Sequence, residues 1–368
     1  GPRMATRHAP ELGAAIGVHD LWVAASAYAP ELGAEFCTAS FKETEALGVL
    51  ARVREQTRKK LIISSAGNAA RAFLEYGARA AIPLVVVAPQ AAAPVLVTAT
   101  QAGDIAPLLL LLDQAMYADA IRFVDAAVAE FSSDLVREGG AFNVARRDAM
   151  AVPFLRAVQA MGGMPDVYVQ AVGSGTGALA AAEAAARLTH SGMYPPHEMR
   201  LLLVQNAPFT PMVDAWASRS RHVISLDDQE VRARLSQVAA SVLSNPSPPY
   251  AVRGGIYDVL QTSHGSMMAV TNEEIHAAQT LAEQTLGFRP CHASAAALAG
   301  LHRAARMHHL PPGQRILLHL TGGGLERLMA ESKVTPYCNK ITVDRRDTAA
   351  GLAAIARYLQ PFTTEPNI

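Results

Sequence analysis

The sequence is short of cysteine, of an excess of either charge and of long hydrophobic runs, and each shortage excludes a class of protein. The three cysteines, Cys37, Cys291 and Cys338, fit no zinc spacing and no disulfide framework, so free thiols in a reducing compartment are expected. Basic and acidic residues balance at 32 each, without the basic stripe that nucleic acid or an anionic membrane requires. The apolar run at 107–112 is too short to span a bilayer, and no secretory signal is visible.

The rest of the composition is that of a well-packed α/β chain. Half of its 368 residues are hydrophobic and 17% are charged, and this length predicts about two domains. Short runs of Val, Ile and Leu alternate with helix-period segments, which predicts buried parallel strands in βα units. Strands are expected at 21–25, 61–64, 84–87, 108–112, 167–172, 201–204, 267–270, 316–320 and 341–343. Helices are expected at 42–58, 68–80, 116–131, 147–160, 176–188, 227–242, 272–285, 294–308 and 347–359.

Three loops rich in small residues come directly after predicted strands. They are "SSAGN" (64–68), "GSGTG" (173–177) and "TGGG" (321–324). In an open α/β sheet, ligands bind at the carboxyl ends of the strands. We therefore expect the three loops to contribute to one binding site.

A single lysine stands where a helix is expected to begin, in the stretch "SFKE" (40–43). Ser40 and Glu43 have the spacing of a capping box, which predicts Ser40 as the N-cap and Lys42 in the first turn. The helix dipole disfavours an ammonium at this end, whereas a neutral amine there suits Schiff-base chemistry. On this pattern alone, Lys42 is either a surface lysine at a frayed helix end or a Schiff-base lysine.

The glycine loop joins a predicted strand to an Ala-rich helix, and its backbone N–H groups suit a phosphate. It consists of Gly173, Ser174, Gly175, Thr176 and Gly177. A dinucleotide fingerprint needs an acidic residue at the end of the next strand, but that strand ends in Gln205 and Asn206. A phosphate monoester therefore fits better than a dinucleotide, and a tight turn without a ligand is the remaining alternative.

A Schiff-base lysine and a phosphate loop together indicate pyridoxal 5'-phosphate (PLP) as the cofactor. The pyridine ring of PLP needs one partner for its nitrogen and one for its hydroxyl. Thr321 can offer a hydroxyl to the ring nitrogen, and Asn68 can donate to the ring oxygen. Because no metal-ligand spacing is present, no metal is expected.

These pieces occur in an order that resembles the fold type II PLP enzymes of the tryptophan-synthase-β superfamily, and within them the threonine synthase branch. The matching motifs are "SFKE" (40–43), "SSAGNAARAFLEYGARAAIPLVVVAP" (64–89), "GSGTG" (173–177), the stretch at 269–301 and "LTGGGLE" (320–326). Other stretches are more similar to cysteate synthases, namely "AYAPELGA" (27–34), "GAFNVARRDAM" (140–150), "QNAPFTPMVDAW" (205–216) and "PPYAVRGGIYDVL" (248–260).

The resemblance implies an α/β fold with two domains, each with a central twisted, largely parallel sheet flanked by helices. A large PLP-binding domain is expected at 4–44 and 151–368. A small, mobile domain that closes over the substrate is expected at 45–150. The resemblance also implies a cytoplasmic homodimer whose partners are an amino-acid substrate and an anionic nucleophile, with no nucleic acid and no membrane.

The same resemblance assigns roles to individual residues. Lys42 is expected to be the catalytic residue and to bind PLP, together with Asn68, the glycine loop and Thr321. The substrate is expected to contact Ser64, Ser65, Ala66, Gly67, Asn143, Arg146 and Arg147. Adjacent residues point about 100° apart on a helix, so one of the two arginines is expected to face the pocket.

The implied reaction is a β-replacement in which O-phospho-L-serine and sulfite give L-cysteate and phosphate through an α-aminoacrylate. Three departures from the threonine synthase pattern leave the substrate open. They are Glu43-Thr44-Glu45 after the lysine, His292-Ala293-Ser294-Ala295 in place of Glu-Pro-Ser-Gly, and Ala149 and Ala151 where glycines are expected. The alternatives are a threonine synthase acting on O-phospho-L-homoserine, a serine/threonine dehydratase or, in another class, an NAD-binding oxidoreductase that uses the glycine loop.

Overall fold

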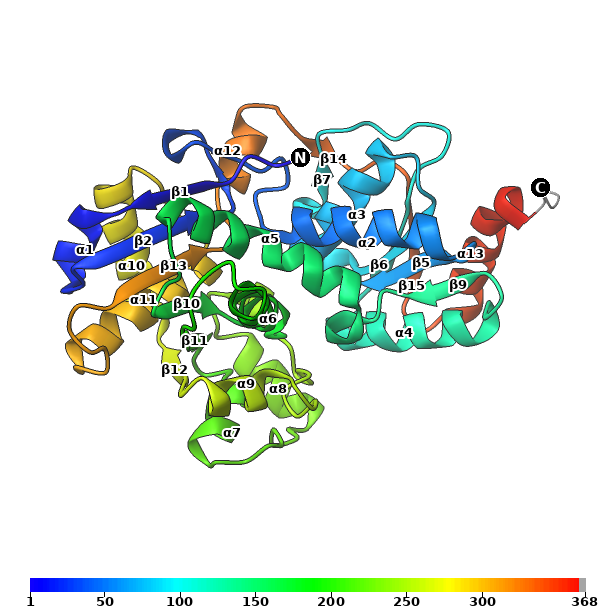
Figure 1. Cartoon of the computed structure of the whole chain (residues 1–368). Coiled ribbons are helices and arrows are strands. Elements are labelled where there is room, and N and C mark those ends of the chain that lie inside the picture. The colour runs from blue at the N-terminus through cyan, green and yellow to red at the C-terminus, as the bar shows by residue number, and fades with distance from the viewer. Residues whose placement is uncertain (364–368) are drawn as a thin grey trace. The chain divides into compact units, whose positions relative to one another are not determined.

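The computed structural model describes residues 1–363 (Figure 1). The chain forms two compact units. Unit 1 comprises residues 1–41 and 150–325. Unit 2 comprises residues 42–149 and the described residues from 326 onwards. Each unit has its own sheet, which confirms the predicted α/β class.

Unit 1 is built on a six-stranded sheet in which only the first strand is antiparallel to its neighbour. In sheet order the strands are β1 (Ala5–His8), β2 (Asp20–Ala25), β13 (Arg315–Leu320), β10 (Val167–Ala171), β11 (Arg200–Asn206) and β12 (Ser266–Val270). A two-stranded ribbon of β3 (Tyr28–Ala29) and β4 (Ala34–Glu35) follows β2 in the chain. Alternate side chains of the parallel strands enter opposite faces, so both faces are buried.

Helices cover both faces of this sheet (Figure 1). They are α1 (Pro10–Ile16), α6 (Thr176–His190), α7 (Pro211–Ala217), α8 (Asp228–Leu235), α9 (Ile256–Thr262), α10 (Asn272–Leu286) and α11 (His292–Arg306), with 3-10 turns η1 (Pro30–Leu32) and η4 (Ser241–Leu243). On one face α1, α10 and α11 bury Leu12, Ile275 and Leu298. On the other face, Phe154 of α5 (Val144–Met161) packs with Leu179 of α6.

Unit 2 is built on a five-stranded, fully parallel sheet. In sheet order the strands are β15 (Lys340–Asp344), β8 (Leu108–Asp113), β6 (Leu84–Pro89), β5 (Lys60–Ser64) and β9 (Leu135–Arg137). The helices are α2 (Lys42–Gln56), α3 (Asn68–Arg79), α4 (Tyr117–Glu130) and α13 (Thr348–Thr363), and α12 (Leu325–Ala330) begins at the last residue of unit 1. Short elements are β7 (Val97–Thr98), paired with β14 (Thr335–Pro336), and the 3-10 turns η2 (Gln90–Val95) and η3 (Gly140–Phe142).

The C-terminal segment differs from the expected domain division, because residues from 326 onwards belong to unit 2 rather than to the large domain. β15 pairs in parallel with β8, from Lys340 opposite Leu109 to Asp344 opposite Asp113. Ala354, Ile355 and Leu359 of α13 enter the core of the same unit. The chain therefore returns to unit 2 to add an edge strand and a helix, which a division by position in the sequence does not reveal.

The predicted strands and helices are present with boundaries shifted by a few residues, with one larger difference. The helix expected at 227–242 ends at Leu235 as α8, and a separate 3-10 turn follows at 241–243. None of the residues of α8 is buried, so no apolar face extends the helix further. The short elements β1, α1, α7, α9 and α12 were not predicted, because each is too short to show a clear period.

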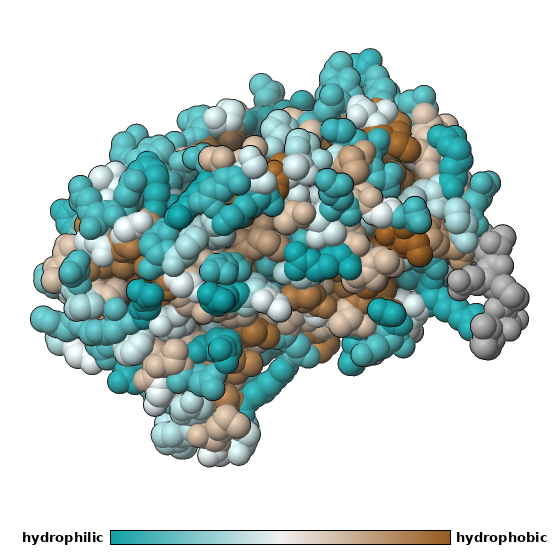
Figure 2. Space-filling view, turned by 90° about the horizontal axis from the view of Figure 1, so that it is seen from above, coloured by the Kyte–Doolittle hydropathy of each residue, from teal (hydrophilic) through white to brown (hydrophobic). Residues whose placement is uncertain are grey.

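The face of the molecule seen in Figure 2 carries its hydrophobic residues among hydrophilic ones. Figure 2 shows hydrophilic residues over most of the visible face, with hydrophobic ones scattered among them. Large exposed hydrophobic residues such as Phe142, Met193 and Ile224 are far apart in the sequence. Among residues 1–363, no helix is both long enough and apolar enough to cross a bilayer.

Candidate active site

Lys42 is the first residue of α2, but Ser40 does not cap this helix. The backbone of Ser40 forms a bridge with Gly322, and its buried Oγ has no hydrogen-bond partner within residues 1–363. The carboxylate of Glu43 accepts a hydrogen bond from the hydroxyl of Tyr76 at 2.8 Å. The predicted capping box is therefore wrong, because tertiary contacts engage both of the residues that would form it.

The side chain of Lys42 lies in a buried ion pair with the next turn of the same helix. Its Nζ is 2.6 Å from Oε2 of Glu45, and the two side chains are only 17% and 1% exposed. Burial lowers the pKa of Lys42, an effect that Glu45 opposes and Arg146 adds to. The alternative of a frayed surface lysine is therefore excluded.

Arg146 of α5 extends this pair into a charge cluster of four residues. Its Nη1 lies 3.3 Å from Oε1 of Glu45 and 2.7 Å from Oε2 of Glu138. Burial raises the pKa of Glu138, with Arg146 opposing it. For Glu45 burial acts in the same direction, but Arg146 and Lys42 outweigh it and the pKa is lowered. Nε of Arg146 and Oε1 of Glu138 are buried without a hydrogen-bond partner in the described part of the chain.

The other two residues of the predicted anion site serve the backbone around the start of α5. Asn143 donates to the carbonyl of Glu138 at 2.6 Å and accepts from the N–H of Arg146 at 3.3 Å, which caps the helix. Arg147 donates to the carbonyl of Ala141. Of the two adjacent arginines, Arg146 therefore reaches the lysine cluster, in line with the expectation that they point in different directions.

Phe41, the residue before Lys42, is held by two of the predicted cofactor-binding segments of unit 1. Its N–H donates to the carbonyl of Thr321 at 3.0 Å. Its ring lies edge-on to His319, with centroids 5.6 Å apart. A Cβ added at Gly177 would lie 2.8 Å from Cε2 of Phe41, so the two residues are in close contact. Phe41, which directly precedes Lys42, is therefore held in place by Thr321 and by the glycine loop.

The glycine loop forms the N-terminus of α6 in a conformation that requires glycine. Gly175 is the N-cap residue with φ of 77°, and the hydroxyl of Ser174 accepts from the N–H of Thr176 at 3.4 Å. A Cβ at Gly175 would lie 2.5 Å from Cγ1 of Ile256, and one at Gly173 would lie 3.0 Å from the carbonyl oxygen of Leu243. Ser174 and Thr176 place their hydroxyl oxygens 3.0 Å apart at the same turn. These residues fit a phosphate bound at the start of α6.

The strand after the glycine loop supports a phosphate monoester rather than a dinucleotide. β11 ends in Gln205 and Asn206, whose side-chain oxygens accept hydrogen bonds from backbone N–H groups. Oε1 of Gln205 accepts from the N–H of Met212 at 2.9 Å, and Oδ1 of Asn206 accepts from the N–H of Ala240 at 2.9 Å. Within residues 200–206, all of which the structure describes, no carboxylate is present to bind a ribose.

The loop at 64–68 leads into α3, which begins at Asn68 as expected. The hydroxyl of Ser65 accepts from the N–H groups of Ala70 at 3.1 Å and Gly67 at 3.5 Å. Oδ1 of Asn68 accepts from the buried guanidinium of Arg71 at 2.7 Å, and the carbonyl of Ser64 accepts from Tyr117. Ala66 is exposed. The predicted contacts of this loop with substrate and cofactor stay predictions.

A buried polar chain that the sequence did not reveal lies next to Phe41. The hydroxyl of Tyr168 donates to Oε1 of Gln170 at 2.7 Å and lies 2.7 Å from Nδ1 of His319. Nδ1 must therefore carry the proton, and Nε2 accepts from Ser26 at 2.9 Å. Burial lowers the pKa of His319 to about 3, so the ring is neutral. The network joins β13 to β10, and its histidine is in ring contact with Phe41, the residue before Lys42.

Replacing Tyr168 with phenylalanine tests this network. The change leaves Nδ1–H of His319 and Oε1 of Gln170 without their partner, so the free energy of unfolding is expected to fall by about 1–3 kcal/mol. Urea unfolding followed by circular dichroism measures it. Tyr257→Phe is the control, because that ring packs on Trp216 and keeps this packing; its change should stay within about 0.5 kcal/mol. Equal stability of the two variants would contradict the network.

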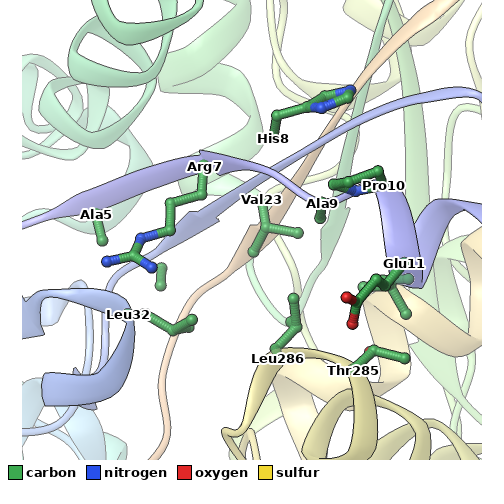
Figure 3. Close-up of a pocket in the computed structure, with 12 residues that line it drawn as sticks. Ala5, Arg7, His8, Ala9, Pro10, Glu11, Val23, Leu32, Thr285 and Leu286 are labelled. Atoms are coloured by element: carbon green, nitrogen blue, oxygen red, sulfur yellow. The ribbon is translucent and has the colours of Figure 1, made fainter.

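A pocket in unit 1 contains none of the predicted site residues. It has a volume of about 240 Å³ and lies among β1, α1, β2 and α10. Figure 3 shows Arg7 and Glu11 on either side of Val23 and Leu286.

Within residues 1–363, no group of three His, Cys, Asp or Glu side chains is placed to hold a metal ion.

Two parallel-stranded α/β units, a buried lysine at a helix entrance and a glycine cradle at a helix N-terminus define a fold type II enzyme with PLP as its cofactor. Residues 6–322 match the family of pyridoxal-phosphate dependent enzymes, and the chain belongs to this family. The family and the cofactor predicted from the sequence are confirmed. The NAD-binding alternative is not retained.

Relatives of known function share much of the sequence. The chain is 43% identical over 354 residues to a cysteate synthase of Methanoregula boonei, covering 96% of this chain and 82% of the relative. It is 41% identical over 316 residues to a cysteate synthase of Methanospirillum hungatei, covering 86% and 74%. A PLP-dependent aspartate racemase has a TM-score of 0.65 at 14% identity, covering 87% of this chain and 90% of that one. A serine racemase from Dictyostelium discoideum has a TM-score of 0.58 at 13% identity, covering 87% and 91%. The solved structures establish the fold.

Two residues of the cluster, Glu45 and Glu138, were not predicted as part of the site. Glu45 did stand out in the sequence, because "SFKETE" departs from the threonine synthase motif after the lysine. Glu138 gave no signal, since it belongs to a loop between β9 and η3 whose position depends on the fold.

Proposed function

We propose that this protein catalyses a PLP-dependent β-replacement that converts O-phospho-L-serine and sulfite into L-cysteate and phosphate. The buried Lys42 at the entrance of α2 carries the proposal, because a lysine of this kind is what holds PLP covalently. The names of the relatives, with 43% identity across 96% of the chain, support the choice of substrates.

Lys42 is proposed to hold and move the proton of the substrate Cα. PLP, when bound, supplies an aldehyde that joins to an amine and a ring that withdraws electrons from Cα. Nζ of Lys42 takes the Cα proton before the phosphate leaves and returns it after the nucleophile has added at Cβ. The neutral amine is the form that can accept this proton, and burial, by lowering the pKa of Lys42, favours that form.

The remaining predicted residues are proposed to bind and orient. The glycine loop would bind the phosphate of the cofactor at the start of α6, through the N–H groups of a helix N-terminus whose N-cap residue, Gly175, has no side chain to offer them. Thr321 would hold the ring nitrogen of PLP, and Asn68 would hold the ring oxygen. The substrate carboxylate binds before the start of α3, at the segment Ser64, Ser65, Ala66 and Gly67 that leads into this helix.

Arg146 is proposed to bind the anions that leave and enter. The cluster of Lys42, Glu45, Arg146 and Glu138 has no net formal charge. Protonation of Glu138, which burial favours by raising its pKa, gives the cluster a net positive charge that suits phosphate or sulfite. Nε of Arg146, buried without a partner in the described part of the chain, is a donor for such an anion. Direct contacts of Asn143 and Arg147 with substrate stay predictions.

Product analysis tests the proposed reaction against its alternatives. The PLP-loaded protein is incubated with O-phospho-L-serine, with and without sulfite, and the products are identified by mass spectrometry. Cysteate and phosphate are expected only when both reactants are present. O-phospho-L-homoserine converted to threonine would indicate a threonine synthase, and a 2-oxo acid with ammonia from serine or threonine would indicate a dehydratase. Either result without cysteate contradicts the proposal.

Three further expectations from the resemblance stay predictions. They are the homodimer, the cytoplasmic location and the closing of a mobile smaller domain over the substrate.

A further inference from the structure

Glu45 occupies a position that links the cofactor lysine to the arginine. It lies three residues after Lys42 on α2, so the two side chains share one face of the helix. Its two oxygens have different partners, because Oε2 meets Nζ of Lys42 at 2.6 Å and Oε1 meets Nη1 of Arg146 at 3.3 Å. The side chain is 1% exposed, and a carboxylate buried to this degree needs charged partners to remain ionised.

We propose that Glu45 is the positioning residue for Lys42. Whenever Lys42 is not bonded to the cofactor, the carboxylate of Glu45 forms an ion pair with its ammonium group and stabilises that form. The inference rests on the proposed role of Lys42. It adds that the chain has a fixed place for the amine released from the cofactor, one helical turn along α2. Glu45 acts through Lys42 and is not proposed to touch the substrate.

Arg146 and Glu138 make this arrangement possible in both states of the lysine. A Lys42 bonded to the cofactor would have no free ammonium to pair with Glu45. The carboxylate then keeps Arg146 as its counter-ion, so it remains charged and ready to receive the ammonium again. Glu138 holds Arg146 from the other side at 2.7 Å, which keeps the guanidinium in place in both states.

The charged groups that act on Lys42 come from three parts of unit 2. Glu45 belongs to α2, Arg146 to α5 and Glu138 to the loop before η3. Tyr117 of α4 faces the same carboxylates, and burial raises the pKa of its hydroxyl, so it is neutral. Among these groups Glu45 is the one that meets Nζ directly. Its carboxylate raises the pKa of Lys42 and so offsets part of the lowering caused by burial.

Removal of the negative charge at Glu45 therefore shifts the pKa of Lys42 in a direction that can be measured. In Glu45→Gln the pKa of Lys42 loses a raising influence and falls further. A unit charge at this distance changes a pKa by about 1–3 pH units. Only the neutral amine adds to the aldehyde carbon of PLP, and water leaves as the C=N bond forms. The pH at which the cofactor-free protein captures PLP thus reports the state of Lys42.

The experiment measures the rate of PLP capture by cofactor-free protein as a function of pH. The adduct is fixed with borohydride and assigned to Lys42 by peptide mass spectrometry. We expect the midpoint of the rate profile to lie at least about 1 pH unit lower in Glu45→Gln than in the wild type. Below both midpoints, capture by the variant is then about tenfold faster for each pH unit by which its midpoint has fallen.

Glu43→Gln is the matched control, because it removes a carboxylate from the same helical turn, one that accepts a hydrogen bond from the hydroxyl of Tyr76. Its midpoint should equal that of the wild type. Glu45→Asp, which keeps the charge but withdraws it from Nζ, should give a midpoint between those of the wild type and Glu45→Gln, and it replaces Glu45→Gln if that variant does not fold. A midpoint at or above the wild-type value in the Glu45 variant overturns the inference.

The same assay separates this inference from the proposed function. It contains neither phosphoserine nor sulfite, so the identity of the substrates does not affect it. If wild-type protein captures PLP at another lysine, the proposed role of Lys42 fails. If capture occurs at Lys42 but the Glu45 variants keep the wild-type midpoint, the inference about Glu45 alone fails.

Discussion

Lys42→Ala is expected to lose the covalent cofactor and to form cysteate at least about 10³ times more slowly than the wild type, because the proposed mechanism assigns both the bond to PLP and the role of Cα base to this one residue. The visible absorbance of the holoprotein should disappear from the purified variant. Borohydride treatment should no longer label the peptide that contains position 42. Activity and spectrum are measured together, since a folded variant without the band localises the loss to the lysine.

Lys59→Ala is the control for this experiment. Lys59 is an exposed lysine of the same unit whose Nζ donates to the carbonyl of Ser132 at 2.7 Å, so its removal should leave activity and absorbance unchanged. Circular dichroism of both variants establishes that they are folded. A Lys42→Ala protein that keeps the absorbance band and a borohydride-stable adduct would show that another residue holds the cofactor.

Arg146→Met is expected to lower the free energy of unfolding of the cofactor-free protein by about 3–5 kcal/mol. The change leaves the carboxylates of Glu45 and Glu138 in a buried site without the guanidinium that lies between them. The urea midpoint of the variant, followed by circular dichroism, should therefore fall well below that of the wild type. The cofactor-free protein is used because ligand binding would add its own stabilisation.

The loss in Arg146→Met should depend on pH in a defined direction. Arg146 lowers the pKa of Glu45 and opposes the rise that burial causes in Glu138, so without it both pKa values rise. The deficit is therefore largest where both carboxylates are charged and shrinks as the pH falls through their raised pKa values. Arg147→Met, which removes a donor to the carbonyl of Ala141, is the control and should cost less. A deficit that does not change with pH would contradict the cluster.

Much of the fold follows from local features of the sequence. Runs such as "LVVVAP" and "RILLHL" are buried on both faces in β6 and β13, so their apolar character marks them without knowledge of the neighbours. The helix at 272–286 begins with a true capping box, in which the N–H of Glu274 donates to the Thr271 hydroxyl and the Glu274 carboxylate accepts from the N–H of Thr271. The same spacing at Ser40 and Glu43 failed, because Ser40 pairs with Gly322 and Glu43 binds Tyr76.

The site shows the same division between local and distant information. Lys42, the glycine loop and Thr321 are visible because each lies in a short motif. The contact of Phe41 with Thr321 joins residues 280 positions apart in the chain, and the bond between Tyr168 and His319 depends on β13 lying beside β10. Arg146 was expected to bind an anion, but only the structure shows that two carboxylates hold it.

The return of the C-terminal segment to unit 2 also affects how the protein is made on the ribosome. The sheet that follows Lys42 lacks its edge strand until β15 at 340–344 has been translated, and its helical cover is incomplete until α13 follows. Unit 1, by contrast, has all its strands once residue 320 has emerged. From its own synthesis until β15 is translated, the edge of β8, with its run of leucines, therefore stays unpaired, and over this interval it is a surface on which the nascent chain can misassociate.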